Sequence, residues 1–361
     1  MDIVVSSPQS SPYIQGYPWS SGFGTKYSNP GSLPDMGSGG GVAFSPDGNN
    51  ILFATFGSGN PPLQAYSWSA GFGTKYSDPS AVGSSGLGAI GGVAFSPSGD
   101  AVAVGTGFVS GGAAVNVFPW TNITGFGSQY SNPASGPAGG SGIGNSVAWS
   151  PSGNAIVIGT DSTPYVQGWP WSAGFGTKYS APLTTPVGSC NGVAFSPDGA
   201  YLAIASQGGV GVLRLAVYPW SSGFGDPPTI PLSSVPTGNG RACAWSPDGA
   251  YVAVAHETAG YIDSYGWSAG FDGTHSNPTS PGGTGQAVAF SSDGAVLAIG
   301  CVASPYVLAY AFSGGFGSKY TDPGTLPTNP VGGLAFTPAS PPPPPPPTTH
   351  GSGGITMMGV G

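Results

Sequence analysis

Short apolar segments recur along this chain at a nearly constant spacing, and each is followed at once by a polar turn. The segments read VAFSPDG or close variants, and the seven copies begin at Val42, Val93, Val147, Val193, Cys243, Val288 and Leu334. Successive copies start 51, 54, 46, 50, 45 and 46 residues apart. This period is typical of four-stranded propeller blades and too long for common helical repeats. The pattern predicts an all-β, seven-bladed β-propeller.

Each repeat divides into four predicted strands, which we name a to d from the axis outward. The recurring segment is strand a, and a Ser-Pro-Asp-Gly turn follows it. In this turn proline presets φ, the aspartate side chain bonds its own backbone, and glycine accepts a positive φ. Strand b follows directly and is apolar and β-branched, as in residues 51–53 and 156–158. Such a composition is expected of a strand that neighbouring blades cover on both faces.

Strand c ends in two aromatic residues separated by one residue. The pairs are Tyr17/Trp19, Tyr66/Trp68, Phe118/Trp120, Trp169/Trp171, Tyr218/Trp220, Tyr265/Trp267 and Tyr310/Phe312. Because strand side chains alternate between faces, both rings of a pair lie on one face. We interpret them as rings packed between blades rather than as a carbohydrate-stacking surface. A Gly-Phe-Gly turn then leads to a polar strand d, such as residues 25–30.

The two ends of the chain are complementary fragments of one blade. Residues before Val42 supply strands b, c and d but no strand a, whereas residues 334–336 form a strand a that no further strand follows. We therefore expect the N-terminal strands to pair with the C-terminal strand and close the ring. This divides the chain into a propeller, residues 1–338, and a tail, residues 339–361.

Strand–SPDG–strand repeats closed in this way resemble the WD40 and YVTN families of β-propellers. The Gly-His and Trp-Asp dipeptides of WD40 repeats are missing, since the Trp is followed by Ser or by Thr121. The hydrogen-bonded tetrad of that family is therefore not carried over. The block W-S-x-G-F-G-[TS]-K-Y-[ST]-[ND]-P is similar to that of uncharacterised propeller proteins encoded by tailed bacteriophages. This resemblance implies a virion protein that is synthesised in the host cytoplasm.

Charge is scarce in this sequence. Only 6% of the residues are charged, with 6 Lys and Arg against 14 Asp and Glu, for a net charge of −8. Because phosphate backbones need clustered cations, nucleic-acid binding is disfavoured. No apolar run approaches the length of a membrane span, and residues 1–5 lack the pattern of a signal peptide. We expect no membrane partner, and we expect Cys190, Cys243 and Cys301 to be reduced, buried thiols.

Residues that recur in every blade are explained by the blade, so candidate chemistry has to lie outside the repeat. No nucleophile elbow, phosphate loop or zinc-binding helix motif is present. His256 and Glu257, with Asp263 across the b–c hairpin, form the one cluster that could suggest metal or acid–base chemistry. A metal site needs three or four converging ligands, so we interpret the cluster as a solvated loop. The sequence predicts no enzyme, no cofactor and no metal.

The propeller connectivity separates two faces of the disc. The a–b and c–d turns form a regular face, from which both chain ends should leave. The d–a and b–c loops form a variable face, and variable loops on a rigid scaffold are the usual place for binding. Candidate binding residues on that face are Asn145, Asn191, Arg241, Gln286, His256, Glu257 and Asp263. The alternative is that the polar residues before strand a simply line a wet axial channel.

Seven consecutive prolines open the tail and should form a polyproline II rod. A Gly- and Met-rich end follows, and its alternative interpretation is a disordered tail. The residues expected to anchor a tether are Pro341, Pro347, Ile355, Met357, Met358 and Val360.

These observations favour a non-enzymatic structural or decoration protein of a tailed phage virion. The tail would bind other proteins of the capsid or tail, and the variable face would point outward. A first alternative is a carbohydrate-binding or host-adhesion module that recognises a host-surface glycan. A second alternative is a lactonase-like propeller hydrolase, for which a metal at the axial mouth would be expected.

Overall fold

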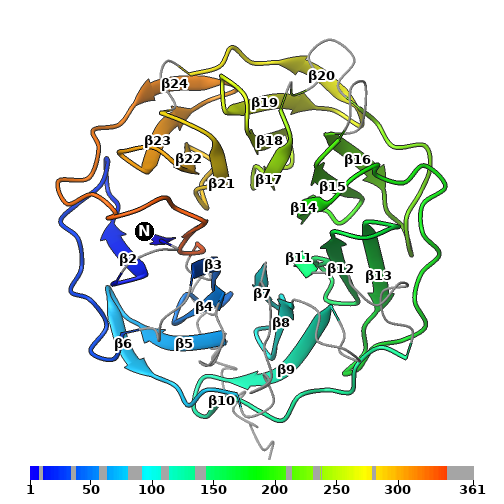
Figure 1. Cartoon of the computed structure of the whole chain (residues 1–361), viewed down its shortest axis with the longest axis horizontal. Coiled ribbons are helices and arrows are strands. Elements are labelled where there is room, and N and C mark those ends of the chain that lie inside the picture. The colour runs from blue at the N-terminus through cyan, green and yellow to red at the C-terminus, as the bar shows by residue number, and fades with distance from the viewer. Residues whose placement is uncertain are drawn as a thin grey trace, which may run out of the picture.

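The chain forms a closed ring of seven antiparallel sheets around a central axis (Figure 1). A computed structural model describes residues 1–7, 11–33, 38–56, 63–79, 92–106, 114–134, 144–208, 214–230, 236, 238–278 and 282–339. Within these ranges all regular secondary structure is β-strand. The predicted all-β, seven-bladed propeller is confirmed.

Four blades have four strands. The first is β3 (Ser38–Phe44), β4 (Asn50–Phe56), β5 (Leu63–Trp68) and β6 (Phe72–Lys75). The second is β7 (Val93–Phe95), β8 (Ala101–Gly105), β9 (Val115–Thr121) and β10 (Gly125–Phe126). The fifth is β17 (Gly240–Trp245), β18 (Tyr251–His256), β19 (Ile262–Trp267) and β20 (Phe271–Thr274). The sixth is β21 (Gly285–Phe290), β22 (Val296–Cys301), β23 (Val307–Phe312) and β24 (Phe316–Lys319).

The other three blades have three strands each. The third blade is β11 (Gly144–Trp149), β12 (Ala155–Thr160) and β13 (Val166–Pro170), and the fourth is β14 (Cys190–Phe195), β15 (Tyr201–Ser206) and β16 (Leu215–Pro219). The seventh combines the two chain ends as β25 (Gly333–Phe336), β1 (Asp2–Ser6) and β2 (Ile14–Pro18).

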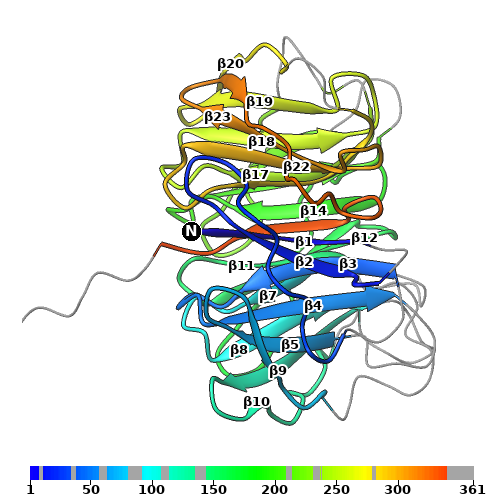
Figure 2. The same ribbon diagram turned by 90° about the vertical axis from the view of Figure 1, so that its left-hand side faces the viewer.

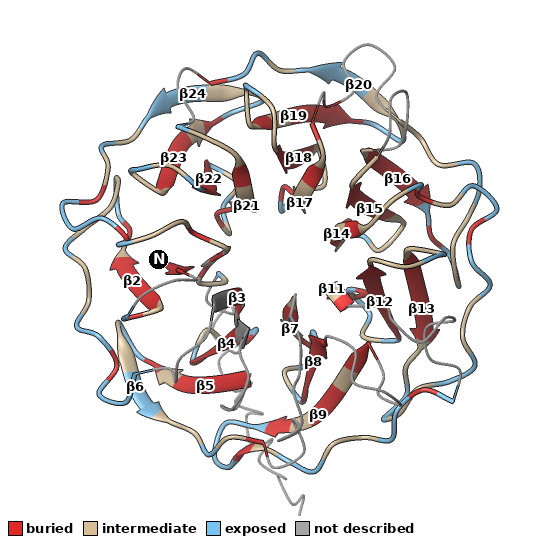
Figure 3. Cartoon of the chain, in the orientation of Figure 1, coloured by how far each residue is buried: buried red, intermediate tan, exposed pale blue. Residues whose placement is uncertain are grey.

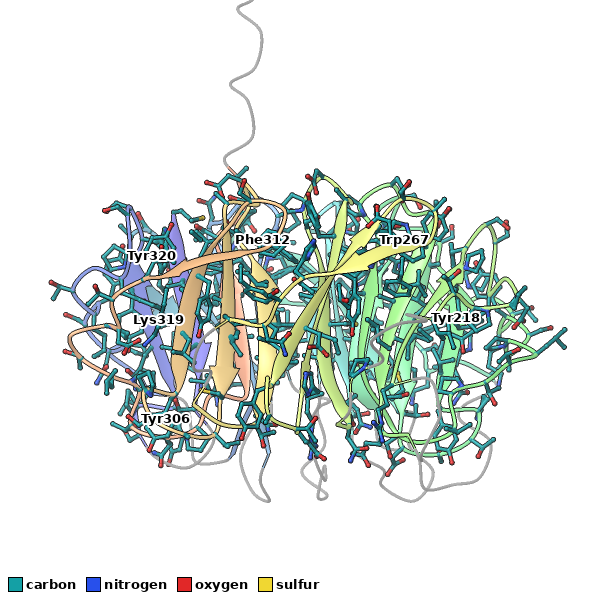
Figure 4. All side chains as sticks on the ribbon, turned by 90° about the horizontal axis from the view of Figure 1, so that it is seen from above. Tyr218, Trp267, Tyr306, Phe312, Lys319 and Tyr320 are labelled. Carbon is teal, nitrogen blue, oxygen red and sulfur yellow. The ribbon has the colours of Figure 1, made fainter. Side chains whose placement is uncertain are left out.

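The closing blade pairs as predicted. Strand β25 lies beside β1 in antiparallel register, with Ile3 opposite Phe336 and Val5 opposite Leu334. Figure 2 shows the N-terminus and the last described residues on the same side of the disc. Figure 4 agrees, because Trp267 and Phe312, before c–d turns, lie toward that side while Tyr306, in a b–c loop, lies toward the other. The assignment of turns and loops to the two faces is therefore confirmed.

The prediction of a strand d in every blade is wrong for the third, fourth and seventh blades. Residues 25–30, expected as a strand, are irregular, and the described chain keeps single bridges such as Trp19 with Phe23 and Trp171 with Phe175. In these blades the residue between the two aromatics of strand c is proline, namely Pro18, Pro170 or Pro219. Proline has no N–H to donate to a strand d. The second blade also has proline there, Pro119, and its outer strand β10 has two residues. The blades with Ser67, Gly266 or Ala311 there have four-residue outer strands.

Burial follows the strand order within each blade. Strands b and c are buried and the outer strands are half-buried or exposed (Figure 3). Between neighbouring blades, a tryptophan at the end of strand c sits in a cluster of edge-on rings. Trp68 contacts Phe44 and Phe72 of its own blade and Tyr27 of the preceding blade, at centroid distances of 5.3, 4.9 and 5.5 Å. The prediction that these rings pack between blades is confirmed.

The Ser-Pro-Asp-Gly turn is held by a side-chain hydrogen bond. Ser196 Oγ donates to Asp198 Oδ1 at 2.6 Å and accepts from the backbone N–H of Tyr201 at 2.9 Å. In the second blade Ser98 replaces this aspartate, and Asp100 takes its place, accepting from Ser96 Oγ at 2.8 Å. Asn154 does the same in the third blade. The acceptor is thus supplied from either of two positions, which explains why serine is tolerated in the turn.

We predict that Asp100→Ala lowers the free energy of unfolding by about 1 kcal/mol, because the Ser96 and Ser98 hydroxyls lose their acceptor. The double variant Ser98→Asp/Asp100→Ala recreates the turn of the fourth blade and should recover most of that loss. Urea denaturation followed by tryptophan fluorescence measures both values. A double variant as unstable as the single one would contradict this account of the turn.

Asp2 connects the two chain ends to the first blade. Its carboxylate accepts hydrogen bonds from Trp68 Nε1 at 3.0 Å and from the Tyr27 hydroxyl at 2.8 Å. Its backbone N–H donates to Thr337 Oγ1 at 2.8 Å, and its carbonyl accepts from the backbone N–H of Thr337 at 2.9 Å. Burial, followed by the hydrogen bond and charge of Asp2, raises the pKa of Tyr27 to about 12. One residue therefore ties three segments of the ring seam together, with its side chain bonding Trp68 and Tyr27 and its backbone bonding Thr337.

We predict that Asp2→Ala lowers the free energy of unfolding by about 1.5–3 kcal/mol, the usual range for hydrogen bonds to a charged group. A spectrophotometric titration should also show a lower pKa for Tyr27. Asp322→Ala is the matched control, because Asp322 pairs with Lys319 at 2.8 Å on an outer strand and such surface pairs contribute about 0–1 kcal/mol. Equal losses in the two variants would show that Asp2 has no special role at the seam.

Candidate functional site

A cavity of about 630 Å³ lies on the propeller axis. It is lined mainly by the first residues of the inner strands β3, β7, β11, β14, β17, β21 and β25, so every blade contributes to it. Because strand a begins at the variable face and ends at the regular face, the cavity opens on the side opposite the chain ends. The structure thus forms a central site on the face where the sequence predicted binding.

Four of the predicted site residues meet at this cavity. They occupy one position, two residues before the first apolar residue of strand a, in four successive blades: Asn145, Asn191, Arg241 and Gln286. In the first and seventh blades the same position is Gly40 and Gly332. In the second blade it is Gly91, outside the described residues. One side of the cavity therefore carries polar side chains and the other side carries glycines. This asymmetry is visible in the sequence when the repeats are aligned on this position.

The two asparagines bridge neighbouring blades. Asn145 Nδ2 donates to the carbonyl of Cys190 at 3.2 Å, and Asn191 Nδ2 donates to the carbonyl of Gly240 at 2.8 Å. Each amide group is thereby held against the start of the next inner strand. Across the described chain, neither Oδ1 atom accepts a hydrogen bond from the protein, so both remain available as acceptors.

Arg241 is the charged residue of the cavity lining. Its Nη2 donates to Glu257 Oε1, and Glu257 Oε2 also accepts from Asn239 Nδ2 at 2.8 Å. The Arg241 and Glu257 side chains are 33% and 30% exposed, so the pair is accessible from solvent. Asn239 was not among the residues predicted from the sequence, although it lies directly before strand β17 and two residues before Arg241. The pair places a carboxylate next to a guanidinium at the rim of the cavity.

The residue after each candidate is small for steric reasons. A Cβ atom on Gly192 would lie 2.9 Å from the Cα atom of Ala242, and one on Gly333 would lie 2.6 Å from the carbonyl oxygen of Gly40. The inner strands therefore approach too closely for larger side chains at this position. The position before it faces the cavity and is free of that constraint.

His256 and Asp263 do not join this site. His256 is 1% exposed in β18, so its interpretation as part of a solvated loop is wrong. Its Nε2 lies 3.2 Å from Asp263 Oδ2 in β19. Asp263 accepts from the hydroxyl of Tyr265, as Gln15 does from Tyr17 in the seventh blade. Asp263 therefore has a structural role within the blade. Its position two residues before the strand-c tyrosine indicates this role.

All three cysteines are free, as expected, and burial raises the pKa of Cys301 to about 11. In the part of the chain that the structure describes, no group of three His, Cys, Asp or Glu side chains could hold a metal ion. The donors at the cavity rim, one carboxylate beside one guanidinium, do not fit the metal that the lactonase alternative implied. The described segments contain no helix that is long and apolar enough to cross a membrane.

The expected tail anchor lies outside the described residues, as do Asp35, Met36 and residues 108–110 of the variable loops. Anchoring through the tail therefore stays a prediction.

No family model and no curated protein matches this sequence, whereas many solved structures match its fold. A periplasmic gluconolactonase from Pseudomonas aeruginosa shares 14% identity, with 94% of this chain and 99% of that one covered and a TM-score of 0.66. A candidate 6-phosphogluconolactonase from Bacteroides uniformis shares 15% identity, with coverages of 93% and 98% and a TM-score of 0.63. A functionally unknown protein from Desulfotomaculum acetoxidans shares 16% identity, with coverages of 92% and 98% and a TM-score of 0.62.

These structures overturn the expectation of a non-enzymatic virion protein. Proteins that share this propeller over nearly their whole length are named as lactone hydrolases, and no virion protein is among those named here. The prediction that the chain is not an enzyme is therefore wrong on the same evidence. The inference failed because it relied on missing sequence motifs. At this level of identity the likeness itself shows a shared seven-bladed fold.

Proposed function

We propose that this protein is a lactone hydrolase that binds its substrate in the axial cavity. The observation that carries the proposal is the Arg241–Glu257 pair at the cavity rim. In a chain with so few charges, a cation and a carboxylate side by side at the central site are the groups suited to acyl chemistry. The fold shared with named gluconolactonases supports this class of reaction.

The proposed reaction needs one electrophilic group and one base. Arg241 uses Nη2 to bind Glu257, which leaves Nη1 to donate to the carbonyl oxygen of the lactone. Glu257 accepts a proton from a water molecule as the water oxygen adds to the carbonyl carbon. The tetrahedral oxyanion that forms is stabilised by the guanidinium charge.

Collapse of this intermediate opens the ring. The bond between the carbonyl carbon and the ring oxygen breaks, and the departing oxygen takes the proton from Glu257. The product is a hydroxy acid with the atoms of the lactone plus one water, and Glu257 returns to its ionised form. Asn239, which donates to Glu257, orients the carboxylate and supports its charge.

The test is hydrolysis of D-glucono-1,5-lactone, followed by proton release with a pH indicator. We expect the wild-type protein to open the ring faster than the spontaneous reaction does. The variants Arg241→Gln and Glu257→Gln should each lower kcat by about 10²-fold or more, which is the usual effect of losing an oxyanion donor or a general base. Arg214→Gln is the matched control, since Arg214 donates to the carbonyl of Pro236 at 2.9 Å and does not line the cavity.

Ring opening no faster than the spontaneous reaction would refute the proposal. Full activity in both site variants would place the chemistry elsewhere. Circular dichroism and thermal melting show whether each variant keeps the propeller.

A further inference from the structure

The charges at the cavity rim nearly cancel. Arg241 is compensated by Glu257, and no other charged side chain of the described chain lines the cavity. The whole protein carries a net charge of −8, which gives no long-range attraction for an anion. A phosphate group entering this cavity would meet a guanidinium that already has a carboxylate partner.

The polar side of the cavity offers neutral hydrogen-bonding groups. Asn145 and Asn191 present acceptor oxygens, because their N–H groups bind the next blade. Gln286 has no hydrogen-bond partner in the described chain, so its whole amide is available as donor and acceptor. Such a set matches hydroxyl groups, which donate and accept in turn.

The opposite side of the cavity has no polar side chain among the described lining residues. There the positions equivalent to the amides are glycines, and the lining includes Pro330 and Val331. A ligand with hydroxyls along one edge could form hydrogen bonds with the amides, while a C–H face on its other side packs against the opposite wall. Sugar rings have this construction.

We infer that the cavity selects a neutral, polyhydroxylated lactone over its phosphorylated counterpart, with hydroxyls directed to Asn145, Asn191 and Gln286. This inference rests on the proposed hydrolase function and names its substrate class. Tight phosphate binding in proteins uses uncompensated Arg or Lys and strong, charge-assisted hydrogen bonds. The rim has a single arginine that is already paired, so a phosphate would be desolvated without adequate compensation.

The experiment compares kcat/KM for D-glucono-1,5-lactone and for its 6-phosphate. We expect the neutral lactone to be preferred by at least about 10-fold, because burying a charge without adequate compensation is unfavourable. Gln286→Ala should raise KM for the neutral lactone about 3- to 10-fold, the usual effect of one lost hydrogen bond. Gln129→Ala is the matched control, because Gln129 bonds Asn132 outside the cavity.

A variant that introduces a positive charge makes the test sharper. Gln286→Lys places an uncompensated cation at the cavity and should shift the preference toward the phosphorylated lactone by about 10-fold or more. A wild-type protein that already prefers the phosphorylated lactone would overturn the inference, as would a preference unchanged by Gln286→Lys in a folded variant.

Failure of the hydrolase proposal can be told apart from failure of this inference. If neither lactone is opened, calorimetry with the neutral D-glucono-1,5-lactam and with 6-phosphogluconate tests recognition alone. Tighter binding of the lactam, weakened by Gln286→Ala, supports the inference without hydrolysis. Equal or tighter binding of the phosphorylated compound, or no binding of either, refutes it.

Discussion

The contact between a strand-c tryptophan and an aromatic ring of the preceding blade is the interaction on which this ring depends. It recurs at every interface, with phenylalanine in place of tryptophan in the sixth blade. Where the fourth blade lacks the usual outer tyrosine, Tyr201 from its strand b fills the place against Trp267 at 5.0 Å. His275 fills it between the fifth and sixth blades. Edge-on aromatic pairs contribute about 0.5–1.5 kcal/mol each beyond the area they bury, so these clusters stabilise each contact between neighbouring blades.

At the axis the constraint is different, because seven inner strands converge there. The residue before the first apolar position must be small, as Gly192 and Gly333 show. The residue before that faces open space and has no packing requirement. Divergence among the blades at this one position is therefore compatible with the fold, and it is there that Asn145, Asn191, Arg241 and Gln286 differ from the glycines of the other blades.

Most of the fold could be predicted from the sequence, because a repeated strand and turn leave few alternative architectures. Strand d was overpredicted since its pairing depends on a backbone N–H that Pro18, Pro170 and Pro219 lack. The placement of Asn145 and Gln286 near the axis could be predicted from the repeat, but the hydrogen-bond partner of Arg241 could not. Glu257 lies 16 residues further along the chain, and only the b–c loop geometry brings the two together. The expectation of a virion protein relied on the absence of linear motifs, and residues that lie one per blade around the axis, such as Asn145, Asn191 and Gln286, form no linear motif.

The closing seam and the cavity are parts of one structure. Gly333, which lines the side opposite the amides, begins the C-terminal strand β25 of the seventh blade and Gly332 directly precedes it, whereas Gly40 belongs to β3 of the first blade. Ser6 of the N-terminal strand links these segments: its hydroxyl donates to the carbonyl of Gly40 at 2.6 Å, and its carbonyl accepts from the N–H of Gly332 at 3.0 Å. Loss of the terminal strand pairing would therefore remove the wall of the cavity opposite the amides before it disturbed Asn145 or Arg241. Ring closure thus stabilises the fold and also sets the shape of the site.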